Sequence, residues 1–249
     1  MLKSFIRGAA YLKKGFLLLN HPEVRFFLLI PTSISLISFG SLTWISFSYL
    51  TQFSKWINNW LPSWLGGVTL LLELFAWLIY LIFIGYIFTT VTLFLASPFY
   101  GLLAEKVEKL ITGNKKKSTD SWLKIVLSIP RSMFREVSKI LHNIILACVA
   151  ICVSFIPLLN IFAPALWFLI GAWIMSISFL DYAMDNNDHR IKEVRKFAHS
   201  KLSLTLGFGA TVSLFAAIPI VNFFVIPSAV VGATLLWCNN SHELDKNIN

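Results

Sequence analysis

The sequence has 249 residues, of which 57% are hydrophobic and only 13% are charged, against about 25% charged residues in an average soluble protein. This composition excludes a disordered chain, a collagen-like fibre and a secreted disulfide scaffold, and it indicates a membrane protein with several spans. Lys and Arg total 21 and Asp and Glu total 12, giving a formal net charge of +9, which suits anionic lipid headgroups or an anionic substrate as partners. The three cysteines all lie in apolar stretches, so we expect no disulfide.

The N-terminal part of the chain predicts one surface helix and two membrane spans. Residues 1–20 place basic and apolar side chains on different helix faces, which favours a helix lying on the membrane over a signal peptide. Residues 26–50 carry no charge and residues 65–99 carry one, Glu73, and both segments are long enough to cross a hydrocarbon core of about 30 Å. An acid inside a span is a candidate proton relay, but Glu73 is close to the start of its segment, where we expect the outer interface.

The segment after the second span is polar and basic. Residues 101–142 have apolar side chains at helical spacing, which predicts amphipathic helices under the membrane with a break near residues 113–117. The lysines at 115–117 lack interleaved aromatic residues, so they indicate a solvated loop or a lipid contact and no nucleic-acid binding.

Two apolar segments in the last part of the chain, residues 143–180 and 202–238, resemble each other. In both, an Ile-Pro pair is followed by an asparagine three residues after the proline, as Pro157 and Asn160 and as Pro219 and Asn222. Proline stops an incoming helix and asparagine caps an outgoing one, so each segment predicts a helical hairpin with its tip at this pair.

The predicted arms of these hairpins are short. Residues 143–156 and 202–218 make helices of about 21 and 26 Å, which favours hairpins that enter the bilayer only part way. Short, Pro-interrupted segments in corresponding positions also mark the binding sites of transporters. Two ordinary hairpins with external loops are the alternative.

The basic residues predict the orientation. With two spans and two returning hairpins, every Lys and Arg except Lys55 falls on one side of the membrane. By the positive-inside rule we expect both termini, with the tail 239–249, and both basic segments, 100–142 and 181–201, in the cytoplasm.

Several segments, in the correct order, resemble the CysZ family of sulfate permeases of bacterial inner membranes. They are ASPFYGLLAEKVE at 96–108, PRSMFRE at 130–136, DYAMDN at 181–186 and the last hairpin at 208–234. The resemblance implies an all-α membrane fold with two long transmembrane helices and two partly inserted hairpins. It also implies sulfate uptake for cysteine biosynthesis, assembly as a homo-oligomer and no cofactor.

The family's sulfate-contacting segment, at the start of the first long helix, reads Gly, apolar, Arg, Arg. The corresponding residues here are Glu23, Val24, Arg25 and Phe26, so Arg25 carries over while an acid and a phenylalanine replace the glycine and the second arginine. An added carboxylate repels a dianion, and one guanidinium group is lost. Arg25 follows Pro22 at a predicted helix start, where free N–H groups suit a tetrahedral dianion. The alternative is an anchoring arginine that pairs with Glu23 or lipid phosphate.

Two further groups of polar residues are candidates for a sulfate path. Asn160 and Asn222, at the hairpin tips, could meet sulfate together with helix N-termini, or could simply cap helices. A charged group beside the apolar segments predicts a salt-bridged network, in which Arg131 and Arg135, one turn apart, could face one anion or belong to a structural lattice. Its members are Glu105, Glu108, Arg131, Arg135, Glu136, Asp181 and Asp185.

The function predicted from these residues is passage of sulfate through a polar path without covalent chemistry. Two negative charges moving inward against about 100 mV cost about 2 × 2.3 kcal/mol, so we expect coupling to protons or to rapid sulfate consumption. A non-transporting protein that shapes or scaffolds the membrane is the alternative. The sequence has no motif for an enzyme nucleophile, a metal site or a nucleotide loop, so neither an enzyme nor an ATP-driven pump is predicted.

Overall fold

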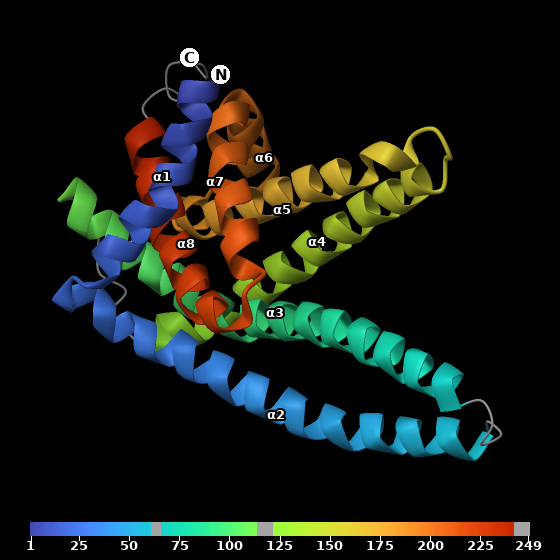
Figure 1. The fold of residues 1–249 in the computed structure, drawn as a ribbon. Coiled ribbons are helices and arrows are strands. Elements are labelled where there is room, and N and C mark those ends of the chain that lie inside the picture. The colour runs from blue at the N-terminus through green and yellow to red at the C-terminus, as the bar shows by residue number, and fades with distance from the viewer. Residues whose placement is uncertain (61–65, 114–121, 242–249) are drawn as a thin grey trace. The chain divides into compact units, whose positions relative to one another are not determined.

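The computed structural model describes residues 1–60, 66–113 and 122–241, and within these ranges the chain is helical with no strand (Figure 1). The long helices are α1 (Leu2–Leu19), α2 (Pro22–Trp60), α3 (Gly66–Thr112), α4 (Trp122–Ser154), α5 (Ala163–Asp185), α6 (Ile191–Ser200), α7 (Leu202–Ala216) and α8 (Pro219–Asn240), with a short 3₁₀ turn, η2 (Asn160–Phe162), before α5.

Three of the described helical segments are long and apolar enough to cross a membrane. They are Pro130–Ser154 in α4, Asn160–Asp185 through α5 and Val221–Asn240 in α8. The predicted class, an all-α membrane protein, is therefore confirmed. The predicted span 26–50 falls within α2, and residues 66–99 of the predicted span 65–99 fall within α3. Residue 65 and many side chains of these two helices lie outside the described residues.

The chain forms two compact units. Residues Thr32–Ala96, the α2–α3 unit, contain most of α2 and the first part of α3, and Met1–Pro31 with Ser97–Asn249 form the main unit. In the α2–α3 unit the Ser54 hydroxyl donates a hydrogen bond of 2.6 Å to Glu73. This bond joins α2 to α3 and holds the single carboxylate of the predicted second span.

Both long helices of the α2–α3 unit exceed the predicted spans. The 39 residues of α2 measure about 58 Å and the 47 residues of α3 about 70 Å at 1.5 Å per residue. The second span was predicted over residues 65–99, but α3 continues to Thr112 with Pro98 inside it. Proline removes one backbone hydrogen bond and bends a helix without necessarily ending it.

The core of the main unit is built from α1, α5, α7 and α8, which make the most numerous contacts between helices. Glycine permits the closest approaches. A Cβ atom on Gly8 of α1 would lie 1.9 Å from the carbonyl oxygen of Leu204, and one on Gly15 would lie 2.1 Å from that of Ser228. The backbone of α1 therefore lies directly against α7 and α8.

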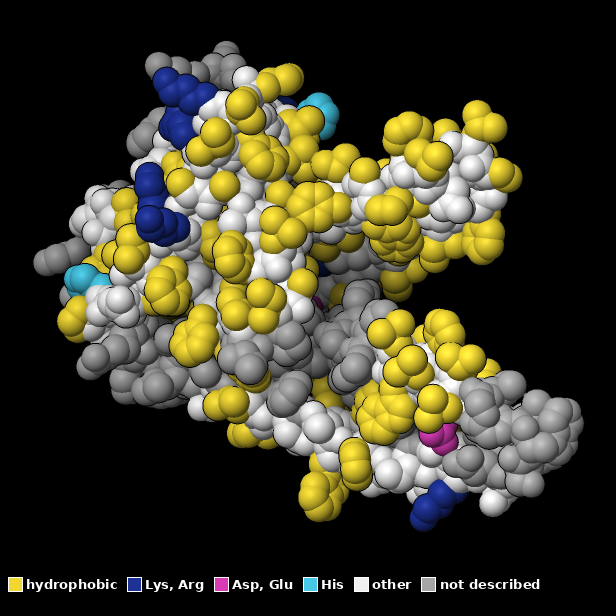
Figure 2. Space-filling model, viewed as in Figure 1, with side chains coloured by type: hydrophobic (Ala, Val, Ile, Leu, Met, Phe, Trp, Pro, Cys, Tyr) yellow, Lys and Arg dark blue, Asp and Glu magenta, His cyan; other side chains and the backbone are white. Residues whose placement is uncertain are grey.

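Residues 1–20 were predicted to form a helix lying on the membrane, and the chain is helical over Leu2–Leu19. Tyr11 and Leu12 are buried against other helices, while Ile6, Phe16 and Leu17 are exposed, so contact of this helix with the membrane surface stays a prediction. Its Lys3 and Arg7 remain exposed, and Figure 2 shows blue basic side chains along this part of the surface. An amphipathic pattern identifies a buried face but does not say whether protein or lipid covers it.

The first hairpin differs from the prediction in the length of its incoming arm. α4 runs 33 residues from Trp122 to Ser154, about 50 Å, and passes the boundary that was predicted at residues 142 and 143. The short 143–156 arm is therefore wrong. Charged residues are followed by apolar residues at this boundary. The change in residue type alters what surrounds the helix, but the helical backbone continues through it. Phe155 and Leu158, between α4 and α5, are exposed. Figure 2 shows hydrophobic side chains in yellow at the far end of the α4–α5 hairpin.

The asparagines at the two hairpin tips do not cap helices as predicted. Asn160 lies in the exposed turn η2, and α5 starts after Phe162 with no side-chain capping bond. In the second hairpin Pro219 is itself the first residue of α8, a position that proline favours. Asn222 is consequently inside α8 and is only 3% exposed.

Candidate functional site

A cleft of about 470 Å³ in the main unit is bounded by α3, α4, α5 and the turn after α5. The predicted network residues Glu105, Glu108, Arg131, Arg135, Glu136, Asp181 and Asp185 all line it. The three sequence segments that carry most of the family resemblance therefore meet at one place.

The arginines of α4 and the aspartates of α5 form a ladder of ion pairs. Arg131 contacts Asp185 at 2.7 Å and Asp188 at 3.3 Å. Arg135 pairs with Asp181, contacts Asp185 at 3.0 Å and donates a hydrogen bond of 3.0 Å to the backbone oxygen of His189. Residues four apart lie on one face of a helix. Arg131 and Arg135 on α4 therefore face Asp185 and Asp181 on α5 as two successive ion pairs. Both guanidinium groups are occupied by carboxylates, which favours the structural lattice over a shared anion.

Beneath the ladder is a buried group that the sequence did not single out, centred on Lys139. Its ammonium lies 2.5 Å from Glu136, 3.3 Å from Asp181 and 4.5 Å from the ring centre of Tyr182. The Tyr182 hydroxyl donates a hydrogen bond of 2.7 Å to Glu136. Arg135 and Lys139 balance Glu136 and Asp181, as burial of charge requires. The spacing Arg131, Arg135, Lys139 continues one helix face and is the signal that could have predicted the position of the lysine.

The third wall of the cleft, α3, is attached to the end of α5 by amide side chains. Asn187 donates hydrogen bonds of 2.9 and 3.0 Å to the Glu108 carboxylate, and Asn186 donates one of 2.8 Å to the Gly101 backbone oxygen. Within α3, Lys109 pairs with Glu105 at 2.5 Å. Asn186 was part of the matching segment at 181–186, whereas Asn187 was not predicted.

The cleft is acidic although the whole chain is basic. Its lining has six carboxylates and three cations, Glu105, Glu108, Glu136, Asp181, Asp185 and Asp188 against Lys109, Arg131 and Arg135. An excess of negative charge repels a dianion. The cleft residues are thus suited to holding helices together and poorly suited to binding sulfate directly.

The predicted sulfate segment lies at the beginning of α2. Since α2 starts at Pro22, Glu23, Val24, Arg25 and Phe26 occupy its first two turns. Val24 is fully buried; the side chains of Glu23, Arg25 and Phe26 lie outside the described residues, so their predicted roles remain predictions.

Two buried polar groups belong to the second hairpin. Asn222 of α8 and Ser213 of α7 each have a buried side-chain oxygen without a hydrogen-bond partner in the described part of the chain. A buried polar atom without a partner costs about 1–3 kcal/mol, so these positions favour contact with water or a polar ligand. Asn160 is exposed, and the two asparagines are therefore not equivalent. Ser213 was not predicted, because a single serine in an apolar helix has no distinguishing pattern.

No group of three potential metal ligands is found among the described His, Cys, Asp and Glu residues. Cys148 and Cys152 are exposed on α4 and are not joined in a disulfide.

Comparison with known proteins gives matches over nearly the whole chain. A family model described as sulfate transporter CysZ/etoposide-induced protein 2.4 matches residues 11–227. The chain is 36% identical over 241 residues to the sulfate transporter CysZ of Pseudomonas paraeruginosa, covering 96% of this chain and 97% of that protein. It is 35% identical to the protein of the same name from Pseudomonas aeruginosa with the same coverage. With the one from Pseudomonas syringae pv. tomato it shares 35% identity, over 93% of this chain and 92% of the relative. These names describe a transporter and not an enzyme.

Proposed function

The chain belongs to the sulfate transporter CysZ/etoposide-induced protein 2.4 family, and we propose that it carries sulfate across the inner membrane of a bacterium. The observation that carries this proposal is the likeness, at 35–36% identity over more than nine-tenths of both chains, to proteins named sulfate transporters. The range matched by the family model, residues 11–227, includes the residues that line the charged cleft.

Within this proposal the cleft and the sulfate path have separate roles. The ion-pair ladder fixes α4 against α5, while sulfate meets Arg25 at the start of α2 and uncharged groups such as the Asn222 amide. A helix N-terminus offers free N–H groups to an oxyanion. An amide in an apolar region avoids the cost of a lone charged side chain, about 2.5–3.5 kcal/mol in the middle of a span.

Charge and surface support a proposal for the orientation and the assembly of the protein. We propose cytoplasmic termini, because nearly all basic residues fall on one side when the predicted spans and hairpins are threaded through a bilayer. Exposed apolar side chains on the described helices, such as Trp44 of α2 and Phe155 at the end of α4, provide surface for lipid and for other copies in a homo-oligomer.

Sulfate uptake by this route needs a driving force. Against an inside-negative potential of about 100 mV, a dianion is opposed by about 4.6 kcal/mol, or a concentration ratio of about 2,000. We propose that proton coupling or removal of sulfate by cysteine biosynthesis supplies it. The two differ in their dependence on a pH gradient in purified liposomes, where no biosynthesis occurs.

The test is uptake of radiolabelled sulfate into proteoliposomes of the purified protein, with phosphate as a competing anion. Saturable uptake that sulfate but not phosphate inhibits would support transport, and stimulation by an imposed pH gradient would support proton coupling. Uptake equal to empty liposomes, with intact protein shown by size-exclusion chromatography, would overturn transport. It would favour a membrane scaffold, which the departures at Glu23 and Phe26 keep as the second candidate.

A further inference from the structure

The outward face of α1 carries positive charge that no acid of the helix balances. Residues 1–22 contain no Asp or Glu, and the exposed cations of this helix are Lys3, Arg7, Lys13 and Lys14. Within the described residues none of these cations forms an ion pair. The buried residues of α1 lie on its other side, against α7 and α8, so the cations are free to meet an anionic partner from outside the chain.

Apolar side chains lie between these cations. Ile6 and Leu17 are 60% and 59% exposed, and at 3.6 residues per turn they share the helix face of Lys3, Arg7 and Lys14. Figure 2 shows dark blue and yellow side chains next to each other over α1. A face that mixes cations with exposed apolar side chains suits the membrane interface, where headgroups meet the cations and acyl chains meet the apolar groups.

A second basic helix, α6, has a different surface. Its apolar residues Val194, Phe197 and Ala198 are buried, and its exposed residues are all polar, among them Lys192 and Lys196. This helix offers positive charge to water or to a soluble anion, but it offers no exposed apolar side chain to lipid. The exposed apolar side chains therefore distinguish α1 from α6 as a lipid-binding surface, and the two helices can be compared directly.

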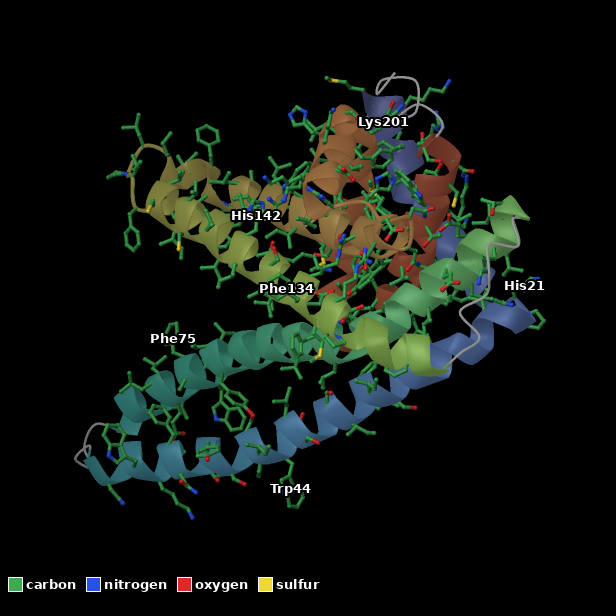
Figure 3. All side chains as sticks on the ribbon, turned by 180° about the vertical axis from the view of Figure 1, so that it is seen from behind. His21, Trp44, Phe75, Phe134, His142 and Lys201 are labelled. Atoms are coloured by element: carbon green, nitrogen blue, oxygen red, sulfur yellow. The ribbon has the colours of Figure 1, made fainter. Side chains whose placement is uncertain are left out.

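The packing of α1 places its basic first half at the open end of the α7–α8 hairpin. The Ser203 hydroxyl, at the start of α7, donates a hydrogen bond of 2.7 Å to the backbone oxygen of Met1. Lys201, which precedes α7, is labelled at this end in Figure 3. The turn at the other end of the hairpin exposes the apolar side chains of Leu214, Phe215 and Ile218. A change from basic to exposed apolar side chains is expected where the headgroup layer meets the hydrocarbon, so the start of α1 lies at the end that suits the headgroups.

We propose that the outward face of α1 binds anionic phospholipids, with Lys3, Arg7 and Lys14 at the phosphate groups and Ile6 and Leu17 against the acyl chains. The planar guanidinium of an arginine can donate two parallel hydrogen bonds to phosphate. A lysine can lay its apolar stem along the lipid while its ammonium reaches the headgroup. The site does not depend on sulfate transport, because its residues are not those proposed to contact sulfate.

The experiment is thermal unfolding of the full-length protein in a neutral detergent, with four additions tested separately. These are short-chain phosphatidylglycerol, short-chain phosphatidylcholine, inorganic phosphate and polyglutamate. Phosphatidylglycerol is expected to raise the Tm of the unaltered protein in a saturable way, and the other three are expected to have little effect. Lys3→Gln combined with Arg7→Gln should weaken the apparent affinity for phosphatidylglycerol about 25-fold, because each cation near an anionic surface contributes a factor of about five.

The matched control is Lys192→Gln combined with Lys196→Gln, which removes two exposed positive charges at the same spacing from α6 and should leave the affinity for phosphatidylglycerol unchanged. Ile6→Ser combined with Leu17→Ser keeps every charge of α1 and should also weaken the affinity, because it removes the apolar contact.

Three results would overturn the proposal. Unchanged affinity in both α1 variants would exclude the site. An equal loss in the α6 control would show that the net charge of the protein, and not the face of α1, attracts the lipid. Equal protection by inorganic phosphate or polyglutamate would exclude the lipid as the ligand.

Discussion

Replacement of Lys139 by methionine tests whether the buried charges of the cleft act as one balanced group. The lysine side chain is 3% exposed and pairs with Glu136 and Asp181, whose side chains are 7% and 3% exposed. Methionine has a similar length and no charge, so Lys139→Met leaves Arg135 as the one cation facing two buried carboxylates. Removal of one partner of a buried pair costs about 3–5 kcal/mol.

We expect the lower end of this range, about 3 kcal/mol or a 150-fold change in the unfolding equilibrium constant. Glu136 keeps the Tyr182 hydroxyl as a donor, and Asp181 keeps Arg135. The second change Glu136→Gln should then restore most of the loss. It removes the uncompensated charge and still accepts the hydrogen bond from Tyr182. The double variant should be within about 1 kcal/mol of the unaltered protein, because a buried ion pair and a neutral replacement are often nearly equal in stability.

The assay is reversible unfolding in mixed micelles with increasing sodium dodecyl sulfate, followed by the far-ultraviolet circular dichroism of the helices. Lys13→Gln, on an exposed face of α1, is the control and should change stability by less than about 0.5 kcal/mol. The reasoning is refuted if Lys139→Met is as stable as the control. It is refuted equally if the losses of Lys139→Met and Glu136→Gln simply add, because additive losses would mean that the two charges do not interact.

Four further outcomes are expected from the same structure. Gly8→Leu should prevent stable folding, seen as loss of the monodisperse size-exclusion peak, because a Cβ atom there would lie 1.9 Å from the Leu204 carbonyl oxygen. Arg131→Gln should cost no more than about 1 kcal/mol in the unfolding assay, since this arginine is 52% exposed and solvent screens its ion pairs. Arg25→Ala should weaken sulfate binding measured by calorimetry with folding intact, and Glu23→Gly should strengthen it by removing repulsion. The Arg190 backbone N–H and then the His189 ring lower the pKa of the Glu193 carboxyl. The stability that Glu193 contributes is therefore present above its unfolded pKa of about 4.3 and is lost as the pH falls through the lower folded pKa. Glu193→Gln should remove this contribution to the pH dependence of stability in the unfolding assay.

The composition of the chain was sufficient to predict the fold class, and the matching segments contained the seven charged residues that were predicted to lie together and that line the cleft. Three further members of the ion-pair network, Lys109, Lys139 and Asp188, were not predicted. The partners within the network were not predictable, because the ladder depends on the register between α4 and α5, which a sequence does not specify. Lys139 was missed since a lysine beside apolar residues is more often solvated than buried. Its depth is apparent only when Glu136 and Asp181 are seen around it.

The errors in the helix boundaries share a physical cause. At His142 the surroundings of α4 change from charged to apolar, and the predicted boundary between the cytoplasmic segment and the first arm of the hairpin lies at this change. At Pro219 the opposite ambiguity applies, because a proline can follow the end of one helix or begin the next. Asn222 therefore lies one turn inside α8 and not at the tip. Neither ambiguity can be resolved without the contacts of the neighbouring helices.

The charges around the cleft distinguish two roles, anion binding and helix packing, that the sequence analysis left open for the same arginines. Arg131 and Arg135 were candidates for anion binding, yet each is held by aspartates of α5, and the cleft has more acids than bases. Sulfate passing this cleft would be repelled, so we propose a path for the dianion that relies on other groups. The candidates are Arg25 at the start of α2, whose side chain lies outside the described residues, and Asn222, whose buried amide oxygen has no hydrogen-bond partner in the described part of the chain. The Asn222 amide can rotate to present its NH₂ group to an anion. If transport occurs, changes at Arg25 and Asn222 should alter the affinity for sulfate, whereas changes in the ladder should alter the stability of the protein and leave the affinity of the folded fraction the same.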